Sequence, residues 1–315
     1  MKAFIFPGQG SQKVGMGKNW YNNYSEAKKI FQEVDEILDE PLSKIIFNGP
    51  DDLLTKTENA QPAILTTSIA TLEVIKTYKK IDISKYCHAT AGHSLGEYTA
   101  LYSSGSIDLE SVVKLVKYRG ELMSKSDKSR AGKMSAIIGL DINHLTQLLK
   151  DFKHEGICEL ANDNSNGQVV VSGNKDAVDE FKNFAKKAGA KLTIDLNVSA
   201  PFHCSLMNEA ANQMKKKLKN ISFLSPKPAV YFNVNATPSN ENEKFPVFLS
   251  QQITSTVKWR QTIESMENES ENSTSINKFF EIGPGSVLTG LVKRIVKKSE
   301  CFSIQNPEDM DNLNK

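Results

Sequence analysis

The chain has 315 residues, of which 39% are hydrophobic and 24% charged, which is enough to bury one large core or two unequal ones. Lys and Arg number 39 against 37 Asp and Glu, and this formal charge of +2 lacks the basic excess of nucleic-acid-binding proteins. No run of about 18 apolar residues predicts a membrane span, and Pro7 interrupts the amino-terminal apolar run too early for a signal peptide. We therefore expect a cytoplasmic protein that binds neither nucleic acid nor membranes.

Cysteine and histidine spacing predicts no metal site. The four cysteines follow neither the C-x-x-C spacing of zinc sites nor the density of a disulfide framework, so we expect reduced thiols. Only five histidines are available as a catalytic base. They are His88, His93, His144, His154 and His203.

The first predicted strand, residues 2–6, ends at the turn Pro7-Gly8-Gln9-Gly10-Ser11, whose glycines let the backbone approach another group closely. A dinucleotide fingerprint would need its third glycine where Lys13 stands, and no Lys-Ser or Lys-Thr pair follows. The turn therefore does not predict a nucleotide cofactor.

Helical patterns follow over residues 26–38 and from Gln61 to Tyr78, where Pro62 opens the second helix. A short apolar segment, residues 87–91, then precedes the motif around Ser94, and a further helix is predicted over residues 109–123.

From residue 133 the spacing of apolar residues changes, and it predicts a second, smaller unit of short strands and helices. Strands are predicted over 134–140, 157–161, 168–172 and 191–196, and helices over 142–152 and 177–188. This βαββαβ order is typical of a ferredoxin-like α+β domain inserted into a larger one. We expect the insert to span residues 128–198 and the large domain to comprise 1–127 and 199–315.

The carboxyl-terminal part begins with residues 267–277, which are rich in Glu, Asn and Ser and predict an exposed loop. An apolar strand over 278–282 then ends at Gly283-Pro284-Gly285. The apolar face of a closing helix follows. It consists of Val287, Leu288, Leu291 and Ile295.

Gly92-His93-Ser94-Leu95-Gly96 is a G-x-S-x-G motif between a predicted strand and a predicted helix. Small flanking residues permit the sharp nucleophile elbow that exposes a serine hydroxyl. The helix start that follows points backbone N–H groups at a developing oxyanion. The motif predicts Ser94 as a nucleophile, with a purely structural turn as the alternative.

A serine nucleophile needs a base, and histidine is the usual one because its pKa lies near neutrality. His93 adjoins Ser94, where neighbouring side chains diverge, and His88 lies in the preceding strand. His203 stands where the chain re-enters the large domain, and such a loop borders the cleft between domains. A structural histidine remains the alternative for His203.

Arg119 interrupts an apolar stripe of its predicted helix, three and four residues from Leu122, Met123, Leu115 and Val116. A guanidinium directed toward a core needs an anionic partner. The partner is either a structural carboxylate or the carboxylate of a substrate, and a stem that reaches solvent is a further alternative.

Together these motifs resemble the malonyl-CoA:acyl carrier protein transacylases, discrete bacterial enzymes related to the acyltransferase domains of fatty acid and polyketide synthases. The likeness spans nearly the whole chain. It is carried by residues 6–12, 92–98, Arg119-Gly120, 161–171, Pro201-x-His203 and 281–285.

The resemblance implies an α/β-hydrolase-like large domain with a ferredoxin-like insert, no cofactor or metal, and malonyl-CoA and holo acyl carrier protein as partners. It implies that Ser94 is the nucleophile, His203 the base and Arg119 the group that binds the malonyl carboxylate. Oxyanion donors would be the backbone N–H groups of Gln9 and Leu95. The carbonyl that orients the histidine would be that of Gln252, with Gln251 as the neighbouring alternative.

The resemblance also matches Asn162 and Asn164 to asparagines near the family's site, whereas Asn166 stands where the family usually has proline. The implied reaction transfers a malonyl group through malonyl-Ser94 for fatty acid biosynthesis. A serine esterase or thioesterase and a non-catalytic acyl-binding module are the rival classes. Lysines at 215–217 and 219, or basic residues at 293, 294, 297 and 298, would either face an acidic carrier protein or merely be solvated.

Overall fold

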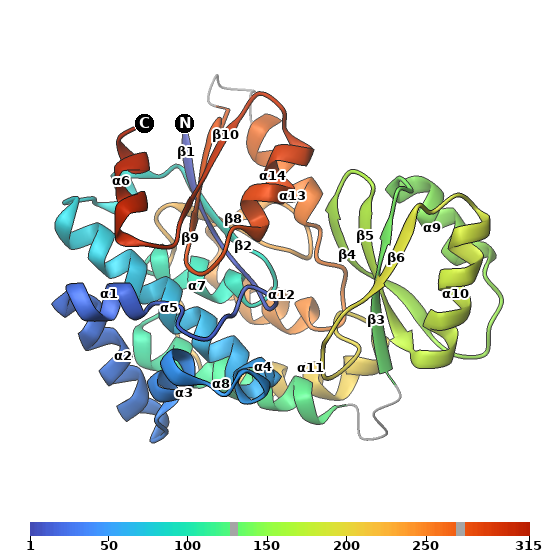
Figure 1. Ribbon diagram of the computed structural model, residues 1–315, viewed down its shortest axis with the longest axis horizontal. Coiled ribbons are helices and arrows are strands. Elements are labelled where there is room, and N and C mark those ends of the chain that lie inside the picture. The colour runs from blue at the N-terminus through green and yellow to red at the C-terminus, as the bar shows by residue number, and fades with distance from the viewer. Residues whose placement is uncertain (127–131, 269–274) are drawn as a thin grey trace.

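The computed structural model of the chain describes residues 1–126, 132–268 and 275–315, and it contains two sheets that lie side by side (Figure 1). The larger sheet consists of β1 (Lys2–Phe6), β2 (Ala89–Gly92), β7 (Ala229–Tyr231), β8 (Pro238–Ser239), β9 (Lys278–Ile282) and β10 (Glu300–Ile304). Its order is β10-β9-β1-β2-β7-β8, and all neighbours are parallel except β7 and β8. An α/β fold is confirmed for this part of the chain.

The central strand β1 is buried on both faces, as its continuous apolar sequence requires. Ala3 and Ile5 pack on one side with α13 (Trp259–Asn268) and α14 (Val287–Ile295). Phe4 and Phe6 pack on the other side. The helices there include α2 (Ser25–Leu38), α5 (Thr57–Tyr78), α7 (Gly96–Ser103) and α8 (Leu109–Lys125).

Shorter helices complete the large domain. They are α1 (Lys18–Asn23), α3 (Leu42–Asn48), α4 (Asp51–Thr55), α6 (Ile83–Tyr86), α11 (Asn208–Leu218), α12 (Phe245–Gln252) and the 3₁₀ segments Ser205–Met207, Asn242–Lys244 and Pro307–Asn314. No helix in the described parts of the chain is long and apolar enough to span a membrane.

The predicted start of α5 at Pro62 is wrong. The helix begins at Thr57, and Pro62 lies inside it. Proline removes one hydrogen bond of the helix, but almost every residue from Asn59 to Ile75 is buried. Packing of this helix therefore outweighs the missing bond, because tertiary burial contributes most of the stability of helices in proteins.

The smaller sheet belongs to the insert. Its elements are β3 (Gly132–Ile138), α9 (Ile142–Asp151), β4 (Cys158–Ser165), β5 (Gln168–Asn174), α10 (Lys175–Lys187) and β6 (Leu192–Asp195). The strand order β4-β5-β3-β6 is antiparallel throughout, which confirms the βαββαβ arrangement. The largest error concerns β4, which extends four residues beyond its predicted end at residue 161.

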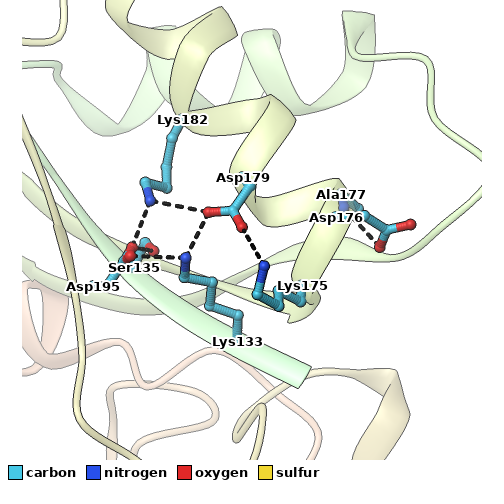
Figure 2. Close-up of polar contacts among 8 residues, drawn as sticks. All are labelled: Lys133, Ser135, Lys175, Asp176, Ala177, Asp179, Lys182 and Asp195. Atoms are coloured by element: carbon cyan, nitrogen blue, oxygen red, sulfur yellow. Dashed lines mark hydrogen bonds and ion pairs between the residues drawn. The ribbon is translucent and has the colours of Figure 1, made fainter. Parts of the chain in front are cut away.

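An ion-pair network ties α10 to β3 and to the edge strand β6 (Figure 2). Lys133 and Lys182 each contact both Asp179 and Asp195, at distances between 2.5 and 3.0 Å. Partial burial alone would raise the pKa of Asp179, but hydrogen bonds from Lys133, Lys182 and Lys175 outweigh it and lower the pKa to about 2. The network stabilises the ionised form of both carboxylates.

Strand β4 also joins the insert to the large domain. The N–H of Asp163 donates to the Val257 carbonyl over 3.0 Å, and the N–H of Val257 donates to Ala161 over 2.9 Å. Arg260 binds the Asp163 carboxylate through two nitrogens, at 3.1 and 2.8 Å. These bonds fix the insert beside the segment that precedes α13.

Several elements were not predicted. Strands β7 and β10 are only three and five residues long, and α11, α12 and α13 lie in a region for which no elements were predicted. The predicted loop over 267–277 overlaps the last two residues of α13, Glu267 and Asn268. Its residues 269–274 lie outside the described residues.

Candidate active site

The candidate site lies at the carboxyl ends of three neighbouring parallel strands. Gln9 follows β1, Ser94 follows β2 and Asn233 follows β7. Ligands of open α/β sheets bind at this edge. A cavity of about 230 Å³ opens there, and Met134 and Val170 of the smaller sheet line its opposite wall. The cavity therefore lies between the large domain and the insert.

Ser94 occupies a tight elbow between β2 and α7, with a backbone φ of 51°. A side-chain carbon on Gly92 would lie 1.8 Å from the carbonyl carbon of Gly96. A side-chain carbon on Gly96 would lie 2.2 Å from the carbonyl oxygen of Phe6. Only glycine fits at both positions, so the two glycines permit the turn that directs the Ser94 hydroxyl into the cavity.

Asn233 holds this elbow from the neighbouring strand. Its side-chain oxygen accepts the Ser94 N–H over 2.7 Å, and its side-chain nitrogen donates to the Gly92 carbonyl over 2.8 Å. The side chain is completely buried. It therefore bridges both ends of a backbone turn that L residues rarely adopt.

His203 is the histidine that reaches Ser94. Its Nε2 lies 2.8 Å from Ser94 Oγ, and its Nδ1 lies 2.8 Å from the backbone carbonyl of Gln252. The contact with a carbonyl acceptor places the ring proton on Nδ1 and leaves Nε2 unprotonated, ready to accept the serine proton. Among the two neighbouring glutamines, the one in contact is Gln252.

The environment keeps His203 neutral. Burial, followed by the nearby positive charge of Arg119, lowers the pKa of His203 to about 3. A group with this pKa carries no proton on Nε2 at neutral pH. Ser94 Oγ and the unprotonated Nε2 of His203 thus have the geometry of a nucleophile and its base.

Arg119 lies beside this pair, and only 1% of it is exposed. Its Nη1 donates to Gln61 Oε1 over 2.7 Å. Its Nη2 donates to Gln252 Oε1 over 2.8 Å and to Ser94 Oγ over 3.0 Å. These partners are neutral, so the guanidinium remains a buried positive charge that favours an anion in the cavity.

Glu97 lies three residues after Ser94, in the first turn of α7, and is completely buried. Burial raises its pKa to about 8, so the carboxyl is mostly neutral at pH 7. One oxygen accepts the Asn233 N–H over 2.6 Å. Glu97 therefore supports the elbow without fully neutralising Arg119.

The backbone N–H groups of Gln9 and Leu95 belong to residues that line the cavity from two sides of Ser94. Neither N–H donates to an acceptor in the described parts of the chain. The loop that carries Gln9 packs tightly on the elbow, since a side-chain carbon on Gly8 would lie 2.4 Å from the His93 carbonyl. Two free donors beside a nucleophile suit a developing oxyanion.

The remaining candidate residues differ in how close they lie to the cavity. His93 and Asn164, whose Nε2 and Oδ1 atoms lie 2.8 Å apart, line the cavity, and so does Asn162 of β4. Asn166 lies in the turn between β4 and β5. His144 and His154 lie in the insert at α9 and just after it, and His88 lies just before β2. In residues 1–126, 132–268 and 275–315, no three His, Cys, Asp or Glu side chains are grouped to hold a metal ion.

Sequence reasoning missed Asn233, Gln61 and the side-chain contacts of Gln252. Each is a neutral amide with at least one partner in the site that lies 58 or more residues away along the chain. No local sequence pattern marks such residues. The one partial signal is that Gln61 is a polar residue within the buried helix α5.

Comparison with known proteins places the chain in a family. The profile of the family described as "Acyl transferase domain" matches residues 3–310. A malonyl CoA-acyl carrier protein transacylase of Bacillus subtilis is 40% identical over 310 residues, which cover 98% of this chain and 95% of the relative.

Solved structures agree. An acyl-carrier-protein-S-malonyltransferase from Bartonella henselae is 40% identical, with a TM-score of 0.94 and coverage of 100% of this chain and 99% of the other. A malonyl-transacylase in complex with a type II PKS acyl-carrier protein is 35% identical, with a TM-score of 0.93 and coverage of 99% and 98%. The chain therefore belongs to the acyl transferase family, and within that family to the malonyl CoA-acyl carrier protein transacylases.

Proposed function

We propose that this enzyme transfers the malonyl group of malonyl-CoA to the pantetheine thiol of holo acyl carrier protein, through a malonyl ester of Ser94, and so supplies fatty acid biosynthesis. The observation that carries this proposal is the arrangement of Ser94, His203 and Arg119 around one cavity. The names of relatives matched over nearly their whole length support the same substrates.

In the first step, His203 Nε2 accepts the proton of Ser94 while Oγ attacks the thioester carbonyl. The carbonyl oxygen becomes an oxyanion that the N–H groups of Gln9 and Leu95 stabilise. Each such donor contributes about 3 to 4 kcal/mol in comparable sites. When the tetrahedral intermediate collapses, the C–S bond breaks and coenzyme A leaves with the proton from His203.

The second step reverses these roles. The thiol of the carrier protein gives its proton to His203, and the thiolate attacks the ester carbonyl of malonyl-Ser94. The C–O bond then breaks, and Ser94 takes the proton back from His203. Because these steps consume and regenerate only groups of the chain and the two thiols, we propose that the enzyme needs no metal or resident cofactor.

Arg119 selects the acyl group in this proposal. Its Nη2 lies 3.0 Å from the nucleophilic oxygen, and Gln61 and Gln252 hold both terminal nitrogens of the guanidinium. A carboxylate close to the scissile carbonyl can therefore replace the Ser94 contact as a charge-assisted partner. Such contacts contribute about 1.5–3 kcal/mol.

We further propose that the large domain comprises residues 1–127 and 199–315 and the insert residues 128–198, since the smaller sheet lies between Gly132 and Asp195. A cytoplasmic location fits the thiols of Cys87, Cys158 and Cys301, which that compartment keeps reduced.

The test is the fate of a labelled malonyl group. The enzyme is incubated with radiolabelled malonyl-CoA, with and without holo acyl carrier protein, and the label is counted on the carrier protein and as free malonate. We expect label on the carrier protein, and the apo carrier protein, which has no thiol arm, is the control. Malonate released at the same rate with and without carrier protein would show a hydrolase instead.

A further inference from the structure

The first turn of α5 contacts both halves of the site. Thr57 begins this helix and Gln61 follows four residues later, so the two side chains share one face. Gln61 holds the Arg119 guanidinium, and the Thr57 hydroxyl accepts a hydrogen bond from Gln9 Nε2 over 3.1 Å. One helix face therefore supports the arginine and also the loop that carries a proposed oxyanion donor.

Within that loop, other contacts fix the residues on either side of Gln9. The Ser11 hydroxyl donates to the Gly8 carbonyl over 2.8 Å, and Gly8 packs against the elbow. In the described parts of the chain, the hydrogen bond that Gln9 makes through its side chain goes to Thr57. Thr57 itself is completely buried. The Gln9 side chain is thus held by one buried hydroxyl.

Close packing of α8 against the start of α5 limits the movement of Thr57. A side-chain carbon on Gly120, the residue after Arg119, would lie 2.9 Å from the Thr57 carbonyl oxygen. Helix α8 therefore approaches the start of α5 so closely that Thr57 has little room to shift. A group fixed in this way can hold a neighbouring loop in one position.

Thr57 also contacts the segment that returns from the insert. Its hydroxyl lies 2.6 Å from the hydroxyl of Ser199. Val198, just before Ser199, lines the cavity, and His203 follows four residues later. The Thr57 hydroxyl thus joins the loop of Gln9 to the segment that carries the base.

We propose that Thr57 is a positioning residue for the oxyanion site, and that Ser199 ties this position to the return from the insert. The proposal rests on the proposed function, in which the Gln9 N–H stabilises the oxyanion. Such a donor acts only where it is already within about 2.7–3.1 Å of the future oxyanion. A Gln9 that is free to turn would weaken the transition-state contact and leave ground-state binding of malonyl-CoA by Arg119 unchanged.

The test compares Thr57→Val with Thr57→Ser and with Ser199→Ala in the full-length enzyme. Valine has nearly the shape of threonine but no hydroxyl. Thr71→Val is the matched control, because Thr71 is also buried in α5 and its hydroxyl donates to the Thr67 carbonyl over 2.9 Å, away from the site. Transfer rates are measured against malonyl-CoA at saturating carrier protein, and the melting temperature is recorded for each variant.

We expect kcat of Thr57→Val to fall about tenfold, since loss of a whole oxyanion donor costs about 10²–10³. The KM for malonyl-CoA should stay within about twofold, Thr57→Ser should restore most of kcat, and Ser199→Ala should show a smaller loss. A kcat of Thr57→Val equal to that of Thr71→Val overturns the role of Thr57. A wild-type kcat for Ser199→Ala overturns the link to the insert.

The proposed function is tested separately by malonyl labelling of Ser94. If Ser94 is labelled at equal rates in the wild type and in Thr57→Val, the role of Thr57 fails while the function stands.

Discussion

Replacing Arg119 by methionine tests how the enzyme selects a carboxylated acyl group. Methionine keeps an apolar stem of similar length in the buried position and removes the charge and the donors to Gln61, Gln252 and Ser94. A malonyl carboxylate would lose a charge-assisted contact of about 1.5–3 kcal/mol, whereas an acetyl group has no carboxylate to lose. At about 1.4 kcal/mol per tenfold, the preference for malonyl should fall by about 10- to 150-fold.

The assay is the ratio of kcat/KM for malonyl-CoA to kcat/KM for acetyl-CoA, measured in competition. Arg119→Lys is the matched variant, because it keeps the charge without the two-pronged geometry, and we expect it to lie between wild type and methionine. Thermal unfolding checks that the variants remain folded. An unchanged ratio in Arg119→Met would refute the role of Arg119 in substrate selection.

The same variant should also change the pKa of His203, the proposed base. The charge of Arg119 is, after burial, the second cause that lowers the pKa of His203 to about 3. Without this charge the pKa of His203 should rise toward its ordinary value of about 6.5. Because the base acts when unprotonated, the acidic limb of the rate with acetyl-CoA should move to higher pH. An acidic limb that does not move would contradict this coupling.

Three further predictions concern other parts of the molecule. Asp195→Asn should lower the free energy of unfolding by only about 1 kcal/mol, because the ion-pair network around Asp195 is partly exposed. Since pairing lowers the pKa of Asp195, this loss should be present above about pH 4 and vanish in stronger acid. Equal unfolding free energies of variant and wild type at pH 7 would disprove it. Glu97→Gln keeps an acceptor for the Asn233 N–H. Because burial raises the pKa of Glu97 to about 8, the stability of the variant relative to wild type should increase from about pH 4.5 to pH 8. A stability difference that does not change with pH in thermal melts would count against a neutral Glu97. Lys293 lies near the exposed end of α14, and the start of that helix lines the cavity. Lys293→Glu should raise the KM for the acidic carrier protein and weaken the salt dependence of that KM, with Lys216→Glu on α11 as the control. Equal KM values in the two variants would exclude the Lys293 face as the docking surface.

The parts of the site that could be predicted from the residues themselves have local signals. Ser94 lies in a short motif with glycines at fixed spacing, and Arg119 interrupts an apolar helical stripe. His203 and Gln9 carry no such signal, because a loop histidine and a glycine-rich turn are common. Their assignment came from resemblance to a family.

Contacts between distant segments could not be predicted. Asn233 reaches Ser94 from 139 residues away, and Gln252 reaches Arg119 from 133 residues away. Each depends on strands and helices whose order in space is set by the whole fold. For the same reason the short parallel strands β7 and β10 were missed, since pairing with a neighbour, rather than their own composition, makes them strands.

Within the insert, prediction succeeded because every element has a clear period of its own. The error in β4 has a physical cause, since its extra residues 162–165 are all polar and so do not predict a half-buried strand. Asp163 can lie there because Arg260 binds its carboxylate, and Asn162 can lie there because its side chain borders the cavity. Function and domain contact explain these polar positions.

In the proposed reaction, Ser94 carries the malonyl group between the two thiols. The most direct measurement is mass spectrometry of the protein after brief exposure to malonyl-CoA and acid quench, followed by peptide mapping. We expect one malonyl adduct, on Ser94, that is absent from Ser94→Ala and is transferred when holo acyl carrier protein is added. An adduct on another residue, or one that persists in Ser94→Ala, would contradict it.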